Sequence, residues 1–171
     1  MENSLAIQGV LKYTKVEVGE SGLKTHNDEG GEAVTGTYRH SIDGKGRLFV
    51  PAKLREELGE TFYVTIGLRH SLMILTEAGW KAMEDKKQSL PMAQAQSLRF
   101  VFANAVRCEP DKQGRILLPA ELRAYANLTQ DAVITGFGDK AEIWDAETYD
   151  AMERAFLREE NLDAVFASLE I

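Results

Sequence analysis

Two short apolar clusters, 48–50 and 116–118, each follow a glycine-containing turn and directly precede a proline. Such a triplet is typical of a short buried strand, because glycine in the turn can adopt the positive φ that reverses the chain. Pro51 and Pro119 are expected to open helices at 52–58 and 120–126, since proline at the first helical position lacks only an N–H that would have no partner.

Four further apolar runs are predicted to be strands, joined in pairs by turns at 67–71 and 136–140. These strands are 62–66, 72–75, 132–135 and 141–144. Helices are predicted at 77–88, 92–105 and 146–169, the second with an apolar stripe of Ala93, Leu98, Phe102 and Ala105. The third helix is expected to pack on its own core, with a subunit contact as the alternative.

An internal repeat organises these elements. Segment 40–55 aligns with 108–123 without a gap, and seven of sixteen positions are identical, where chance would give roughly one. The identical pairs are Asp43/Asp111, Gly46/Gly114, Arg47/Arg115, Pro51/Pro119, Ala52/Ala120, Leu54/Leu122 and Arg55/Arg123. A unit of roughly 40 residues is too small to bury a core alone, so the two copies are expected to complete one another.

Charge is unevenly distributed along the 171 residues, which carry a net charge of −7. Residues 1–33 hold three Lys against six Asp/Glu, and 145–171 hold two Arg against eight Asp/Glu. Subtracting both from the totals of 20 and 27 leaves 15 basic and 13 acidic residues in 34–144, a net +2. A local basic face is therefore compatible with the acidic total.

Other features of the composition narrow the class of protein. The single cysteine, Cys108, excludes an intrachain disulfide and a Cys-rich metal cluster. No apolar run reaches the roughly 20 residues of a membrane span, and the start of the chain lacks the features of a signal peptide. A cytoplasmic location without membrane contact is expected.

The segments Asp43–Arg47 and Asp111–Arg115 share the pattern DxxxR, each followed by an apolar triplet, a proline and a Leu-Arg pair. This doubled motif resembles the MraZ family of bacterial regulators, whose halves each resemble the AbrB/SpoVT looped-hinge DNA-binding fold. The resemblance covers about 34–150. It implies a transcriptional regulator of the division and cell-wall gene cluster that binds direct repeats upstream of its own operon, forms ring-shaped homo-oligomers and associates with the nucleoid.

The fold class expected from this resemblance is α+β and β-rich. Two tandem AbrB/SpoVT-like units would form a pseudo-symmetric β-barrel with connecting and C-terminal helices. The expected parts are a first DNA-binding unit at 34–81, a helical linker at 82–105, a second unit at 106–150 and an acidic C-terminal helix at 151–171.

The extension 1–33 departs from the family, whose members usually begin close to the segment matching Gly36–Tyr38. We expect a mis-set start codon, since Val34 can be encoded by GTG and 29–32 by a purine-rich ribosome-binding site. Disorder or a fusion remnant are the alternatives.

The basic residues of the two turns are the candidates for contact with double-stranded DNA. An arginine projecting from a glycine turn can meet phosphate or the O6/N7 edge of guanine bidentately. The DNA-binding set is Arg47, Lys45, Arg39, Arg115 and Lys112. The first turn is expected to contribute more, because Glu109 precedes the second.

Asp43 and Asp111 are expected to orient these arginines across the turns, with Gly46 and Gly114 shaping the backbone. Two interpretations stay open: the aspartate presents the arginine to DNA, or the pair is purely structural. For Arg55 and Arg123 the alternative to DNA contact is a salt bridge at a helix C-terminus or between subunits.

Catalysis fits the sequence poorly. The three histidines, His26, His40 and His70, lack metal-ligand spacing, the segment 44–46 does not match a phosphate loop, and Cys108 is expected to be buried. We expect no enzymatic activity, metal, cofactor or small-molecule substrate. The alternative functions are an oligomeric assembly module without DNA binding and an antitoxin-like regulator.

Overall fold

The computed structural model describes residues 15–17, 24–26 and 34–169, and confirms the α+β class. The first unit contains β3 (Thr37–Ser41), β4 (Arg47–Phe49), α1 (Ala52–Leu58), β5 (Phe62–Ile66), the 3-10 turn η1 (Leu68–His70) and β6 (Leu72–Thr76). The second unit repeats it with β7 (Val106–Cys108), β8 (Arg115–Leu117), α4 (Ala120–Tyr125), β9 (Asp131–Phe137) and β10 (Lys140–Asp145). The helices α2 (Glu77–Gln88) and α3 (Met92–Ala103) connect the units, and α5 (Ala146–Phe156) and α6 (Glu159–Ser168) follow them.

The two units exchange strands within one antiparallel sheet of order β3-β9-β10-β6-β5-β7. The first strand of each unit pairs with the third strand of the other unit, since β3 pairs with β9 and β7 pairs with β5. The last strands, β6 and β10, meet at the centre. This order is symmetric under exchange of the units, as the repeat predicts. The described strands leave β3 and β7 at the edges, so closure into a barrel stays a prediction.

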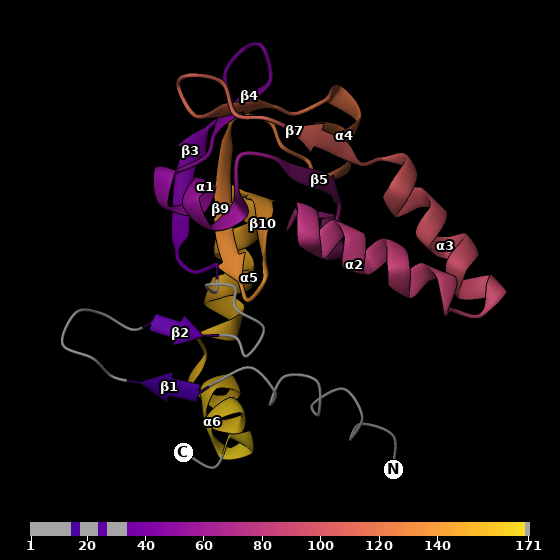
Figure 1. The fold of residues 1–171 in the computed structure, drawn as a ribbon. Helices are drawn as coiled ribbons and strands as arrows, with labels where there is room; N and C mark the ends of the chain where they lie inside the picture. Colours follow the sequence, from indigo (N-terminus) through magenta and orange to yellow (C-terminus); the bar gives the residue numbers. More distant parts are fainter. Residues whose placement is uncertain (1–14, 18–23, 27–33, 170–171) are drawn as a thin grey trace.

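A second pairing joins the units outside this sheet. The short strands β4 and β8 run antiparallel and form a two-stranded ribbon, the β4–β8 ribbon. Leu48 lies opposite Ile116 in its register, and both side chains are buried. The turns at 43–46 and 111–114, called the first and second turn below, project near β4 at one end of the molecule, while α2 and α3 extend away to the side (Figure 1).

The core is built from repeat-related residues of both units. Leu48, Val50 and Leu54 of the first unit are fully buried. Their counterparts Ile116, Leu118 and Leu122 are likewise buried. Because the two halves pack into one apolar cluster, each supplies the burial that the other lacks.

The apolar triplets differ from the prediction in their middle residues. Phe49 is only partly buried, and Leu117 is 58% exposed. Side chains on a strand alternate between two faces, so burial of Leu48 and Val50 turns Phe49 outward. The prediction that all three positions of each triplet are buried was wrong for this reason.

The helices follow the sequence closely, with two exceptions. Pro51 and Pro119 are the N-caps of α1 and α4 rather than their first residues. The single helix predicted over 146–169 is wrong, because Arg158 has an extended backbone (φ −64°, ψ 136°) that separates α5 from α6. The side-chain amide of Asn161 donates a hydrogen bond to the carbonyl of Ala155 across this break, at 2.8 Å. No glycine or proline marks the break in the sequence.

Only Lys15–Glu17 (β1) and Lys24–His26 (β2) of the expected extension are described, and they pair as antiparallel strands. The rest of 1–33 lies outside the described residues, so the interpretation of this segment stays a prediction. In the part of the chain that the structure describes, no helix has the length and apolar character needed to cross a membrane.

Gly136 of β9 allows the segment that enters the first unit to pass close to the backbone. A Cβ on Gly136 would lie 2.5 Å from the carbonyl carbon and oxygen of Val34, whose side chain is 2% exposed. Gly136→Ala should therefore lower the free energy of unfolding by about 1–3 kcal/mol, the usual cost of overpacking. Thermal and urea denaturation monitored by circular dichroism would measure it.

Gly44→Ala is the matched control, since a Cβ there meets no atom within 4 Å. It should leave the melting temperature close to that of the unmodified chain. Equal stability of the Gly136→Ala and Gly44→Ala proteins would contradict the close backbone contact.

Candidate nucleic-acid interface

The first turn is held by its own backbone and by the carboxylate of Asp43. The amide of Gly46 donates to the Asp43 carbonyl at 2.9 Å, and the amide of Asp43 donates to the Arg47 carbonyl at 3.0 Å. Asp43 Oδ1 accepts the amides of Lys45 and Arg47, both at 2.9 Å. Gly46 has φ +80°, a conformation in which any other L-residue would be strained. The turn is therefore a closed, pre-formed loop.

The second turn repeats this arrangement bond for bond. The amide of Gly114 donates to the Asp111 carbonyl at 2.8 Å, and Asp111 Oδ1 accepts the amides of Gln113 and Arg115 at 2.9 Å. Gly114 has φ +76°. The spacing of Asp, Gly and Arg that the two copies share thus corresponds to a matching set of hydrogen bonds and backbone conformations.

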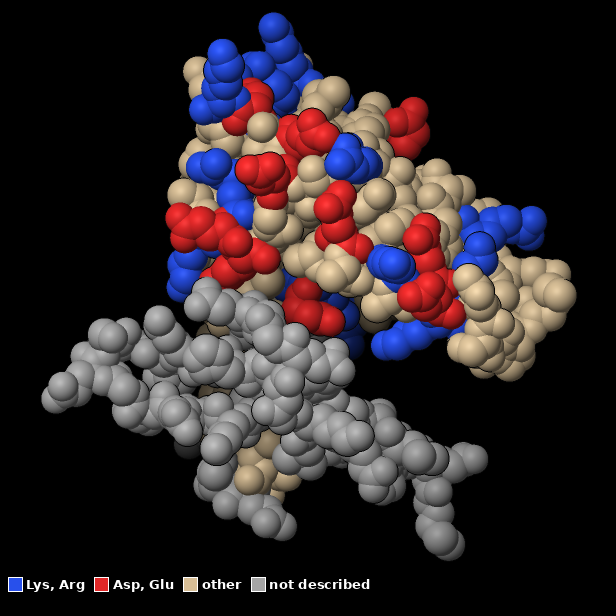
Figure 2. Space-filling model, in the orientation of Figure 1, with Lys and Arg blue, Asp and Glu red and all other residues tan. Residues whose placement is uncertain are grey.

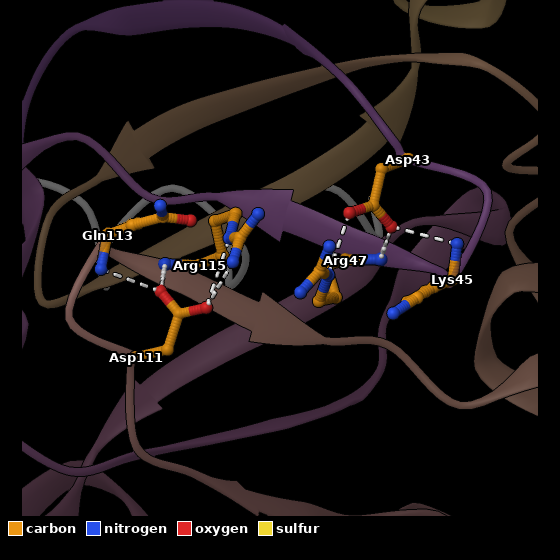
Figure 3. Close-up of polar contacts among 6 residues, drawn as sticks. All are labelled: Asp43, Lys45, Arg47, Asp111, Gln113 and Arg115. Carbon is orange, nitrogen blue, oxygen red and sulfur yellow. Dashed lines mark hydrogen bonds and ion pairs between the residues drawn. The ribbon is translucent and has the colours of Figure 1, made fainter.

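The predicted ion pairs are present in both turns (Figure 3). Arg47 Nε donates to Asp43 Oδ2 at 2.7 Å, while Arg115 donates through Nε and Nη2 to Asp111 Oδ2 at 3.0 and 2.9 Å. Neither Nη group of Arg47 has a partner among the described residues. The aspartate thus fixes the inner edge of the Arg47 guanidinium and leaves its outer donors free for a ligand.

These contacts keep the aspartates ionised. The backbone N–H and then the side chain of Arg115 lower the pKa of Asp111 to about 2 from its usual 3.8. The backbone N–H of Arg47 is the main cause that lowers the pKa of Asp43. A carboxylate with a lowered folded-state pKa stabilises the fold above its usual pKa, and this contribution is lost as the pH falls through the lowered value. Both turns therefore keep their ion pairs at neutral pH.

The outward face of the β4–β8 ribbon carries both arginines. Arg47 lies opposite Leu117, and Arg115 lies opposite Phe49. All four share one face, because the alternate residues Leu48 and Ile116 point into the core. The two arginines lie between the two aspartates in the view of Figure 3. A two-stranded β-ribbon can enter the major groove of DNA.

Leu117 and Phe49 were missed as surface residues by the sequence interpretation. An exposed apolar side chain between two arginines could contact a thymine methyl group. The period-two alternation within each triplet was the signal that could have found them, once the first and third positions were assigned to the core.

Basic side chains gather around the turns. Lys45 and Lys112 are exposed, one on each turn, with no partner for either side chain among the described residues. Figure 2 shows Lys and Arg collected at the end of the molecule where the turns of Figure 1 project. The basic face expected despite the net negative charge is therefore present at this end.

Arg39 lies apart from this cluster. It extends from β3 to α5, where its Nη2 pairs with Asp150 Oδ1 and its guanidinium lies 6.0 Å from the ring centre of Tyr149. The Arg39 side chain lowers the pKa of Asp150. The structure thus joins Lys45, Arg47, Lys112 and Arg115 at one end and places Arg39 beside a helix.

Arg55 and Arg123 form no salt bridge within the described part of the chain, and a salt bridge between subunits stays a prediction. Arg55 Nε donates to the Val50 carbonyl and Arg123 Nε to the Leu118 carbonyl, each at 3.0 Å. Both guanidiniums therefore fold back over the N-terminal end of their own short helix.

Residues considered for catalysis do not assemble. The ring of His40 packs against Phe49, and the neighbouring Ser41 Oγ donates to Asp131. Burial raises the pKa of the Cys108 thiol to about 11, which keeps it protonated and unreactive. No group of three or more metal-ligating side chains occurs in the described ranges.

Comparison with known proteins identifies the relatives of this chain. The family model "MraZ protein, putative antitoxin-like" matches twice, at residues 33–100 and 101–169. A protein of Desulfitobacterium hafniense named "Transcriptional regulator MraZ" is 53% identical over 112 residues, which cover 64% of this chain and 78% of the relative. The protein of the same name from Carboxydothermus hydrogenoformans is 49% identical over 117 residues, with 67% and 82% covered.

These matches agree with the doubled turn seen in the structure. Both repeats are recognised separately, and the relatives are named as regulators of transcription rather than as enzymes. The chain belongs to the MraZ family of transcriptional regulators.

Proposed function

We propose that this chain is a sequence-specific DNA-binding regulator that uses the β4–β8 ribbon and its two turns as the reading surface. One observation carries the proposal: two matching glycine turns, brought together by the ribbon, each present an arginine that its own aspartate holds in place. Free guanidinium donors on a rigid loop suit bidentate contact with guanine. The relatives named as transcriptional regulators favour the same function.

Lys45 and Lys112 are proposed to contact phosphate, since both are exposed and unpaired among the described residues. Arg47 and Arg115 are proposed to contact base edges. Arg39 would reach DNA only if its pairing with Asp150 opened, so its contribution is proposed to be the smallest. The target proposed from the family resemblance is a set of direct repeats upstream of the chain's own operon in the division and cell-wall gene cluster. The proposed location is the cytoplasm, in association with the nucleoid.

A ring-shaped homo-oligomer is the proposed binding form. One chain presents few charges to DNA, whereas several chains on successive repeats gain affinity through effective concentration. Large apolar side chains lie exposed on the helices outside the sheet, including Met92 (74%) and Phe100 (59%) on α3 and Phe156 and Phe166 on α5 and α6. Exposed apolar surface of this kind favours contact between subunits.

Arg47→Ala is expected to abolish specific binding while fold and assembly persist. Loss of a bidentate guanine contact should cost about 1–3 kcal/mol for each engaged subunit. Fluorescence anisotropy at fixed salt, with a duplex spanning the DNA directly upstream of the gene and a scrambled duplex, would measure it. Unchanged affinity for the upstream duplex would refute the proposed mechanism.

Asp43→Asn is a matched variant of the same turn. It keeps an oxygen that can accept the amides of Lys45 and Arg47 but removes the charge that holds the Arg47 guanidinium. A purely structural pair predicts a lower melting temperature for both variants. A reading role predicts weaker binding with the melting temperature nearly kept, to a smaller extent in Asp43→Asn than in Arg47→Ala.

Lys45→Ala should weaken binding to all duplexes alike, since a phosphate contact carries no sequence information. The slope of log K against log salt should fall in magnitude by about 0.9 for each phosphate that is no longer neutralised. Lys81→Ala removes the same charge from an exposed position on α2 and should leave the slope unchanged. A selective decrease in affinity for the upstream duplex in Lys45→Ala would instead assign Lys45 to base contact.

Light scattering behind a sizing column should give a mass several times the 19.0 kDa of one chain. Phe100→Ser and Phe166→Ser, which remove exposed apolar area from α3 and α6, should reduce that mass. If the unmodified chain elutes as a monomer at micromolar concentration, the ring proposal fails. Assembly without DNA binding would support the assembly-module alternative.

A further inference from the structure

Arg55 and Arg123 occupy equivalent places on α1 and α4, and in the described part of the chain no salt bridge at a helix C-terminus accounts for their geometry. Both are half-buried, and each donates from Nε to a carbonyl just before its helix. Neither has an ion-pair partner in the described part of the chain. A half-buried guanidinium without a carboxylate needs another reason for its placement.

Each guanidinium covers the glycine of the other unit's turn. A Cβ on Gly46 would lie 2.9 Å from Cζ of Arg123 and 3.0 Å from its Nε. On Gly114 a Cβ would lie 3.1 Å from Cζ and Nε of Arg55. Both sets of distances are tighter than a real side chain ordinarily accepts. The flat guanidinium therefore lies directly on the glycine backbone, in the space that a Cβ would otherwise occupy.

Backbone hydrogen bonds close the same connection. The amide of Leu118 donates to the Gly46 carbonyl at 2.9 Å, and the Leu118 carbonyl accepts Nε of Arg123, which covers Gly46. The first turn is thus bonded to the second unit through Leu118 and covered by Arg123. In the mirror arrangement the amide of Val50 donates to the Gly114 carbonyl at 2.8 Å, and the Val50 carbonyl accepts Arg55 Nε.

We propose that Arg55 and Arg123 are crosswise positioning residues: Arg123 of the second unit holds the first turn, with Arg47 on it, and Arg55 of the first unit holds the second turn, with Arg115 on it. The consequence for DNA binding rests on the proposed function, whereas the crosswise support of the turns does not. Because each turn is shaped by the opposite unit, the two reading arginines keep a fixed separation. Rigid support of this kind limits the conformational entropy that a loop gives up when it binds its target.

The test compares Arg123→Ala with Arg55→Ala in the full-length chain, without DNA. Hydrogen exchange followed by NMR should show severalfold faster exchange of the Gly46 and Arg47 amides in Arg123→Ala, with Gly114 and Arg115 unchanged. Arg55→Ala should show the reverse. Lys53→Ala, which removes an exposed charge from α1, should alter neither turn. Faster exchange in the turn of the same unit, or in both turns equally, would overturn the proposal.

If either variant fails to fold, NMR signals of the arginine Nε–H groups in the unmodified chain give a second measurement. The Nε–H resonances of Arg55 and Arg123 should exchange more slowly than that of exposed Arg99. Gly46→Ala should shift the Nε–H signal of Arg123 and leave that of Arg55 in place. An Arg123 Nε–H that exchanges as fast as that of Arg99 would overturn the crosswise contact.

DNA binding separates positioning from direct contact. If Arg123 is a positioning residue, Arg123→Ala should reduce specific affinity while the salt slope stays the same, and Lys should not restore it because it lacks a planar guanidinium. A phosphate contact predicts a reduced slope and rescue by Lys. In an Arg47→Ala background, Arg123→Ala should cost little further specific affinity. If Arg47→Ala binds the upstream duplex as tightly as the unmodified chain, the proposed function fails. The hydrogen-exchange results would still show whether each arginine supports the turn of the other unit.

Discussion

The structure depends on strand pairing between the repeats. In the sheet, the first strand of each unit pairs with a strand of the other unit and not with one of its own. Among the described strands, β3 pairs with β9 of the other unit, and β6 pairs with β10 across the centre. A unit of roughly 40 residues buries too little apolar surface to fold alone. Pairing across the units solves this by merging two small cores into one, with the β4–β8 ribbon at its end. The turns are close together because the cores are shared.

Local hydrogen bonding then determines what the ribbon presents. The aspartate of each turn accepts two backbone amides and one arginine, so a single carboxylate both folds the loop and aims the side chain. The sequence left open whether the Asp–Arg pair is structural or orients the arginine. The same carboxylate contacts would serve both roles. An acidic chain can carry a basic surface in this way, since the charges that face a ligand are decided by position rather than by the total.

Much of the local structure could be predicted from the sequence. Glycine, proline and the spacing of residues determine structure over a few positions, so they predict the short strands, α1, α2 and the Asp–Arg pairs. The repeat is visible in the sequence itself. The outward position of Leu117 was missed although the alternation of side chains along a strand indicates it. The break at Arg158 and the placement of Arg39 could not be predicted, because no glycine or proline marks the break and Asp150 lies far from Arg39 in the sequence. The contacts of Arg55 and Arg123 also require knowing which unit lies opposite.

The ribbon joins two copies within a single chain, and those copies are not identical. The first turn reads Gly44-Lys45 where the second reads Lys112-Gln113, so the cationic side chain sits at different positions on otherwise matching loops. A dimer of identical units would be symmetric and would bind either orientation of a duplex equally. Because the fused copies differ, the two ends of this surface are not equivalent. A duplex bound there as proposed would fit differently in its two directions.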